Sequence, residues 1–284
     1  MPTTTDAPLR VFLHGWGQAP ESWSWSDRIP AGDDLLLPLP GHGKAEEAPA
    51  TAWVDRLEAQ LPPQRPLHLI GWSLGAMLAL EIAARQYRRV VQLDLYAATP
   101  CFLRRPDWPH GIDRQSLHAL VDHLIARRDP ARFVRLMVHG VIGDRARLRA
   151  FTRDYLASLP PPQPAGLRAG AALLEQLDLR ATAAAVRQPV TLWHGTEDRI
   201  VPIAAAEWLS RRLPHAELHR LAGRGHMPWI DARGMPPRPC RLHGRSRYLQ
   251  AEGRTRTIAV APKGTADPPR PCRVEAQNVR PWPR

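Results

Sequence analysis

Short apolar runs alternate with segments of helical periodicity along most of the chain. Apolar runs of strand length, several of which end in glycine or proline, occupy residues 9–16, 34–43, 67–72, 90–98, 189–195 and 216–222. Apolar side chains at helical spacing occupy residues 51–61, 74–86 and 203–213. Thr51 stands where it could cap the first of these helices. The alternation predicts an α/β fold in which helices cover both faces of a mostly parallel sheet.

Residues 101–187 interrupt this alternation. They contain several helical segments separated by proline-rich breaks such as "SLPPPQP", and no clear strand. A helical excursion of this length between two strands of a sheet is typical of a lid. We therefore expect a core formed by residues 1–100 and 188–230, with residues 101–187 as a helical lid above it.

The pattern changes again in residues 231–284. Hydrophobic periodicity stops there, and the segment holds nine prolines and 12 Lys or Arg against 4 Asp or Glu. We interpret this basic, Pro/Arg-rich tail as mostly disordered. A basic nucleic-acid arm and a shifted reading frame are alternatives. The regular aromatic residues expected of a nucleic-acid arm are missing.

Charge and composition narrow the class of protein. The net charge of +12 would suit a nucleic-acid partner, but residues 1–230 hold 27 Lys or Arg against 23 Asp or Glu, so the tail carries most of the excess. No apolar run approaches the ~18–20 residues of a membrane span, and "MPTTTDAPLR" lacks the features of a secretory signal. The three scattered cysteines favour neither a disulfide scaffold nor a zinc site. We expect a cytoplasmic monomer with no nucleic-acid or membrane partner.

The pentapeptide Gly71-Trp72-Ser73-Leu74-Gly75 joins a predicted strand to a predicted helix. A sharp turn there would lift the Ser73 hydroxyl above the carboxyl edge of the sheet, where doubly wound folds bind their ligands. Such a turn is crowded, which favours glycine two positions before and after the serine. The Leu74 N–H, at the helix start, could stabilise an oxyanion. The alternative is an ordinary strand–helix turn, since such pentapeptides also arise by chance.

A serine nucleophile needs a base, and the base needs an acid to orient it. Asp198 lies just after one predicted strand, and His226 lies in a glycine-flanked loop after the last one. Ser73, Asp198 and His226 thus follow one another in the chain order expected for a hydrolytic triad on this fold. The neighbouring Glu197 is a competing candidate for the acid.

The loop "HGWG" after the first predicted strand should supply a second oxyanion donor. We expect this donor to be the backbone N–H of Trp16. His14 in the same loop is expected to support the loop, because no His, Cys or carboxylate stands at ligand spacing from it to predict a metal.

These motifs resemble those of the α/β-hydrolase family. "FLHGWG", "LPGHG", "GWSLG", "HGTEDRIVP" and "GRGHMPW" occur in family order between residues 9 and 230. Within the family, "LIGWSLGAMLALEIA" and "ATPCFLRRPDWPHGI" make the chain most similar to the biotin-pathway carboxylesterases that cleave the methyl ester of pimeloyl-acyl-carrier protein. The resemblance implies an α/β-hydrolase fold with a helical lid, no cofactor, Ser73, Asp198 and His226 as the catalytic triad, and Trp16 and Leu74 as an oxyanion hole that binds substrate.

The chain departs from this family pattern after Ile230. Relatives continue with an amphipathic helix that packs under the sheet, and none is recognisable here. We expect the loss of this helix to uncover apolar sheet surface, which would lower stability at about 25 cal/mol per Å².

Positive charge gathers in residues 101–187, which hold 14 Arg against 8 Asp or Glu. Solvated helix faces would account for these arginines, but as a group they suit an acidic partner or a phosphate. The resemblance implies acyl-carrier protein as that partner and Arg132, Arg145 and Arg149 as substrate-binding contacts. Apolar side chains that could line an acyl channel, or simply pack in the core, are Trp72, Phe102, Leu136 and Met137.

We therefore expect a serine carboxylesterase that hydrolyses the methyl ester of pimeloyl-acyl-carrier protein through an acyl-enzyme. One alternative is an esterase, lactonase or C–C hydrolase acting on a free small molecule. Another is a non-catalytic or damaged hydrolase-fold protein.

Overall fold

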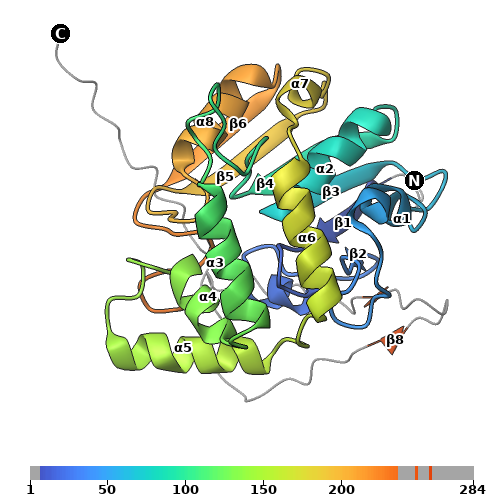
Figure 1. Ribbon diagram of the computed structural model, residues 1–284. Helices are drawn as coiled ribbons and strands as arrows, with labels where there is room; N and C mark the ends of the chain where they lie inside the picture. The colour runs from blue at the N-terminus through green and yellow to red at the C-terminus, as the bar shows by residue number, and fades with distance from the viewer. Residues whose placement is uncertain (1–6, 236–246, 249–255, 258–284) are drawn as a thin grey trace, which may run out of the picture.

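Parallel strands form the centre of the molecule (Figure 1). The structure is a computed structural model that describes residues 7–235, 247–248 and 256–257. The parallel strands are β1 (Leu9–Leu13), β2 (Leu35–Leu37), β3 (Leu67–Trp72), β4 (Val90–Tyr96), β5 (Val190–Gly195) and β6 (Ala216–Leu221). They lie in the order β6-β5-β4-β3-β1-β2. The predicted mostly parallel sheet is confirmed.

Two strands of two residues each extend the sheet beyond β2. They are β7 (Arg247–Tyr248), parallel to β2, and β8 (Arg256–Thr257), antiparallel to β7. Apart from these two strands and residues 231–235, the tail that is predicted to be mostly disordered lies outside the described residues.

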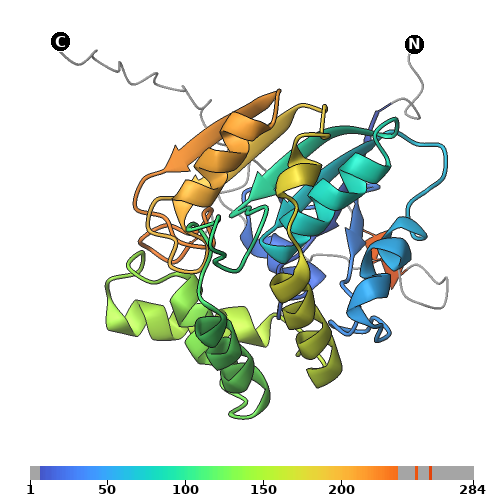
Figure 2. The ribbon, with the colours of Figure 1, turned by 45° about the horizontal axis from the view of Figure 1, so that its top comes forward.

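Helices α2 (Leu74–Arg85), α7 (Arg180–Ala183) and α8 (Ile203–Arg212) cover one face of the sheet (Figure 2). Helix α1 (Trp53–Glu58) lies against α2. The 3-10 helix η1 (Pro20–Trp25) packs on the other face, where Trp23 contacts Phe12 and Tyr96 edge-on. Thr51 does not cap α1, because it lies inside a 3-10 turn, η2 (Ala50–Ala52), that precedes the helix.

Four helices stand beyond the carboxyl ends of the strands (Figure 1). They are α3 (Arg114–Ile125), α4 (Pro130–Met137), α5 (Arg145–Ala157) and α6 (Pro164–Gln176). An aspartate caps the first turn of α3, α4 and α5, and proline opens α4 and α6. We call α3–α6 the lid helices. The predicted division of the chain at residues 100 and 187 stays a prediction.

The sheet face opposite α2 and α8 is polar and aromatic along β4, β5 and β6. Gln92 and Glu217 are exposed there, and the ring of Trp193 stacks between Tyr96 and His219. Arg28 lies over the Trp193 ring, 5.8 Å from its centroid. Both polar side chains and aromatic rings thus occupy this region, and the expectation that apolar sheet surface is uncovered stays a prediction.

No helix of the described residues is both long enough and apolar enough to cross a bilayer. Nor do these residues contain a group of three or more His, Cys, Asp or Glu arranged to hold a metal ion.

Candidate active site

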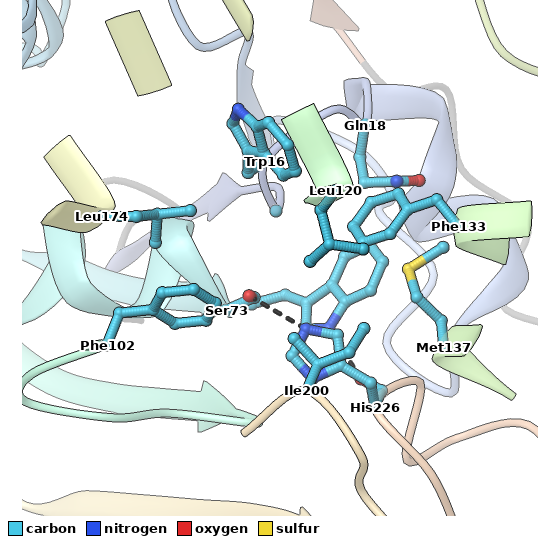
Figure 3. A pocket seen from close by; sticks show the side chains of 12 residues that line it. Trp16, Gln18, Ser73, Phe102, Leu120, Phe133, Met137, Leu174, Ile200 and His226 are labelled. Carbon is cyan, nitrogen blue, oxygen red and sulfur yellow. Dashed lines mark hydrogen bonds between the residues drawn. The ribbon is translucent and has the colours of Figure 1, made fainter. Parts of the chain in front are cut away.

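Ser73 stands on a strained turn between β3 and α2. Its backbone has φ 55° and ψ −117°, a conformation that L-residues rarely adopt. A Cβ on Gly71 would lie 2.6 Å from the Gly75 carbonyl oxygen, and one on Gly75 would lie 2.2 Å from the Leu13 carbonyl oxygen. Both glycines are thus required by close backbone contacts, and the turn aims the Ser73 side chain into the space under the lid helices (Figure 3).

A chain of hydrogen bonds joins the three predicted triad residues. The Nε2 of His226 is 2.9 Å from the Ser73 Oγ, and its Nδ1 is 2.8 Å from Oδ2 of Asp198. All three residues are at least nine-tenths buried, so these contacts are shielded from water. The Trp72 indole N–H donates to the His226 carbonyl at 2.9 Å and holds the histidine loop against the serine turn.

Asp198 is held as a carboxylate in spite of its burial. Burial raises the pKa of this group, but the charge of His226 and hydrogen bonding to His194 and His226 outweigh it, so the pKa lies well below the ordinary value. The other oxygen, Oδ1, accepts backbone N–H groups of Ile200 at 2.8 Å and Val201 at 2.9 Å. Glu197 is exposed, and its carboxylate accepts the hydroxyl of the adjacent Thr196 at 3.4 Å and has no hydrogen bond with His226 among the described residues.

The loop that carries Trp16 lies directly beside the serine. A Cβ on Gly15 would be 3.5 Å from the Cβ of Ser73. The Trp16 indole N–H donates to the Leu167 carbonyl of α6 at 2.8 Å, which ties the loop to a lid helix. Leu74 begins α2, where its N–H has no partner one turn earlier in the helix. Both backbone groups are therefore next to Ser73, and their role as oxyanion donors stays a prediction.

Two neutral histidines hold this loop in place. Nε2 of His42 accepts the Gly17 N–H at 3.1 Å, and Nε2 of His14 accepts the Leu39 N–H at 3.0 Å. Burial lowers the pKa of His14 to about 3, with a further contribution from nearby His42, and burial lowers the pKa of His42 to about 4. The geometry agrees with the expectation that His14 supports the loop. His42 belongs to the motif "LPGHG", which did not by itself indicate this role.

A pocket opens above Ser73 (Figure 3). Its apolar walls come from Trp16, Trp72, Phe102, Leu120, Phe133, Met137, Leu174 and Ile200. Three of the four residues proposed for an acyl channel belong to this set, whereas Leu136 is half-buried outside it. Gln18 also lines the pocket. A role for Gln18 was not predictable from the sequence, because only its place two residues after Trp16 connects it with the site.

The three arginines proposed as partner contacts lie on two lid helices, away from the pocket wall. Arg132 is on α4, and Arg145 and Arg149 are on α5. All three side chains are exposed. The structure therefore places them on the outer surface of the lid and not beside Ser73.

The chain belongs to the alpha/beta hydrolase family, whose model matches residues 11–235. The predicted fold class is thereby confirmed. Among individual proteins, the pimeloyl-acyl-carrier protein methyl ester esterase of Aromatoleum aromaticum is 40% identical over 79% of this chain and 93% of its own length. The esterase of the same name from Nitrosomonas europaea is 37% identical over 81% of this chain and 92% of its own length. The resemblance inferred from the motifs is confirmed.

Solved structures agree on the fold. A bromoperoxidase from Bacillus anthracis superposes with a TM-score of 0.64 at 20% identity, covering 78% of this chain and 86% of its own. An esterase from Exiguobacterium antarcticum gives a TM-score of 0.62 at 18% identity over the same shares. At this level of identity the likeness concerns the fold alone.

Proposed function

We propose that this chain is a serine carboxylesterase that hydrolyses the methyl ester of pimeloyl-acyl-carrier protein. The observation that carries the proposal is the hydrogen-bonded series from Ser73 through His226 to Asp198 at the floor of an apolar pocket. The names of the relatives at 40% and 37% identity support this substrate.

The proposed reaction uses His226 twice. It takes the Ser73 proton as Oγ attacks the ester carbonyl carbon, and the tetrahedral oxyanion accepts the N–H groups of Trp16 and Leu74. The C–O bond to the methoxy group then breaks, and His226 gives its proton to the methoxy oxygen, which leaves as methanol. A water molecule, deprotonated by His226, releases the acid and restores Ser73. Asp198 keeps the imidazole oriented and stabilises its charged form.

The charge balance of the lid supports an acidic carrier as the partner. Among the described residues, the arginines without a carboxylate partner include Arg132, Arg145 and Arg149, the three proposed contacts. By contrast, Arg127 pairs with Asp122 and Arg153 with Asp154. Unpaired exposed guanidinium groups remain available to carboxylates or a phosphodiester.

The first test combines active-site labelling with hydrolysis. Purified protein should form a fluorophosphonate adduct at Ser73 and release methanol from methyl pimeloyl-carrier protein. Ser73→Ala should lose both, with kcat lower by roughly a thousandfold or more. A folded wild-type protein that is not labelled would contradict a serine hydrolase and favour a non-catalytic protein.

The second test concerns the carrier. Arg132→Glu combined with Arg149→Glu should lower kcat/KM for the carrier-bound ester by roughly tenfold or more and leave free dimethyl pimelate unaffected. Arg153→Glu is the matched control, since Arg153 already pairs with Asp154 at 2.8 Å. Equal rates for the free and carrier-bound esters in the wild-type protein would favour the free small-molecule hydrolase.

A further inference from the structure

The pocket wall holds one polar side chain that the proposed reaction does not use. Gln18 is 4% exposed and lines the same pocket as Ser73. Figure 3 places it on the side of Phe133 and Met137, across the pocket from Phe102. A buried amide among apolar walls needs hydrogen-bond partners for both its Oε1 acceptor and its Nε2 donor.

The carbonyl oxygen of this amide already has a hydrogen-bond partner. The Tyr155 hydroxyl, on α5, donates to Oε1 of Gln18 at 2.7 Å. Tyr155 is fully buried, and its ring is fixed by stacking on Phe151 and by an edge contact with Trp25. Burial also raises the pKa of Tyr155, which keeps the hydroxyl protonated and able to donate. In this arrangement the Tyr155 hydroxyl engages the Oε1 end of the Gln18 amide and leaves the Nε2 end facing away from it.

The nitrogen end remains as an unused donor. Gln18 Nε2 has no hydrogen-bond partner within residues 7–235, while the polar atoms of neighbouring wall residues are engaged: the Trp16 indole with Leu167 and the Trp72 indole with His226. An oriented donor in a pocket with apolar walls favours ligands that bring an acceptor oxygen, and it penalises ligands that leave the donor unpaired.

We propose that Gln18, oriented by Tyr155, donates a hydrogen bond to an acyl-chain carbonyl oxygen other than that of the ester under attack. The pocket then selects esters of dicarboxylic acids over esters of monocarboxylic acids with the same chain length. This inference rests on the proposed esterase function and deepens it, because it states what the pocket requires of the acyl group.

The test compares dimethyl pimelate with methyl heptanoate, two esters with seven-carbon acyl chains that differ in the second carbonyl. In Gln18→Leu, the ratio of kcat/KM for dimethyl pimelate to that for methyl heptanoate should fall roughly tenfold. Tyr155→Phe should lower the ratio by a smaller factor, because the amide stays but loses its orientation. Leu120→Ala removes part of an apolar wall. It should lower kcat/KM for both esters and leave the ratio of the two values near that of the wild-type protein.

Binding to Ser73→Ala separates this inference from the proposed function. Dimethyl pimelate should bind this inactive protein more tightly than methyl heptanoate, and adding Gln18→Leu should remove the difference. An unchanged preference in folded Gln18→Leu, in hydrolysis or in binding, would overturn the role of Gln18. A wild-type protein that binds the diester in this manner yet hydrolyses neither compound would overturn the esterase function and leave the role of Gln18 supported.

Discussion

At the residue scale, the site depends on positions where the backbone leaves no room for a side chain. Gly75→Ala would place a Cβ 2.2 Å from the Leu13 carbonyl oxygen and 2.5 Å from that of His14. Neither backbone atom can move without disturbing β1, so we expect a loss of about 3 kcal/mol or more in the free energy of unfolding. Urea titration measures this loss. Gly143→Ala is the matched control, because nothing lies within 4 Å of its added Cβ, and it should stay near the wild-type stability.

Asp198 provides a second test at this scale. Asp198→Asn keeps the size of the side chain but removes the charge that orients the His226 ring, so the ring can turn its proton toward Ser73. We expect kcat to fall by roughly three to four orders of magnitude, with little change in the stability of the fold. The exposed neighbour Glu197 is the control, and Glu197→Gln should leave kcat unchanged. A comparable loss in Glu197→Gln would reassign the acid.

At the element scale, the strands and the turns after them could be predicted from the sequence because both signals are local. Alternating apolar runs mark the strands, and the glycines around Ser73 mark the turn. The contacts of the predicted triad could be inferred from its motifs, but contacts between distant segments that no motif marks could not be predicted in this manner. The bond from Tyr155 to Gln18 joins residues 137 positions apart, and the bond from Trp16 to Leu167 spans 151. No spacing rule connects such pairs, because tertiary packing alone brings them together.

The bond between Trp16 and α6 can be tested directly. Trp16→Phe keeps an aromatic ring in the wall but removes the indole donor to the Leu167 carbonyl, leaving a buried acceptor without its partner. We expect the loop beside Ser73 to become less ordered. The value of kcat/KM should then fall by about threefold to tenfold. Trp108→Phe breaks a similar buried bond, to the Cys101 carbonyl, outside the pocket. It should affect stability but not kcat/KM. Equal kcat/KM losses in both variants would contradict a local role for Trp16.

At the scale of the whole molecule, His14 and His42 couple stability to pH. Their pKa values in the folded protein are about 3 and about 4, below the ordinary value of 6.5. Below pH 6.5 the unfolded chain binds protons at these positions that the folded chain does not. Their contribution to stability is therefore complete above pH 6.5 and is lost as the pH falls toward 4 and then 3.

Urea unfolding between pH 4.5 and 6 measures this coupling. His42→Gln keeps an acceptor for the Gly17 N–H but does not titrate. As the pH is lowered, the free energy of unfolding of this variant should decrease less steeply than that of the wild-type protein. The two slopes should differ by up to about 1.4 kcal/mol per pH unit. Parallel curves for wild type and His42→Gln would contradict neutral burial of His42.

The lid helices are joined to the loops beneath them by backbone contacts. The His226 N–H donates to the Met137 carbonyl at the end of α4 at 2.9 Å, and the Gln163 N–H, just before α6, donates to the Gly41 carbonyl at 2.9 Å. A segment bonded in this manner to the loops around Ser73 cannot detach on its own without displacing the proposed catalytic residues. Limited proteolysis should therefore inactivate the protein at the same rate at which it cuts α4, and deuterium uptake at the His226 amide should follow that of α4.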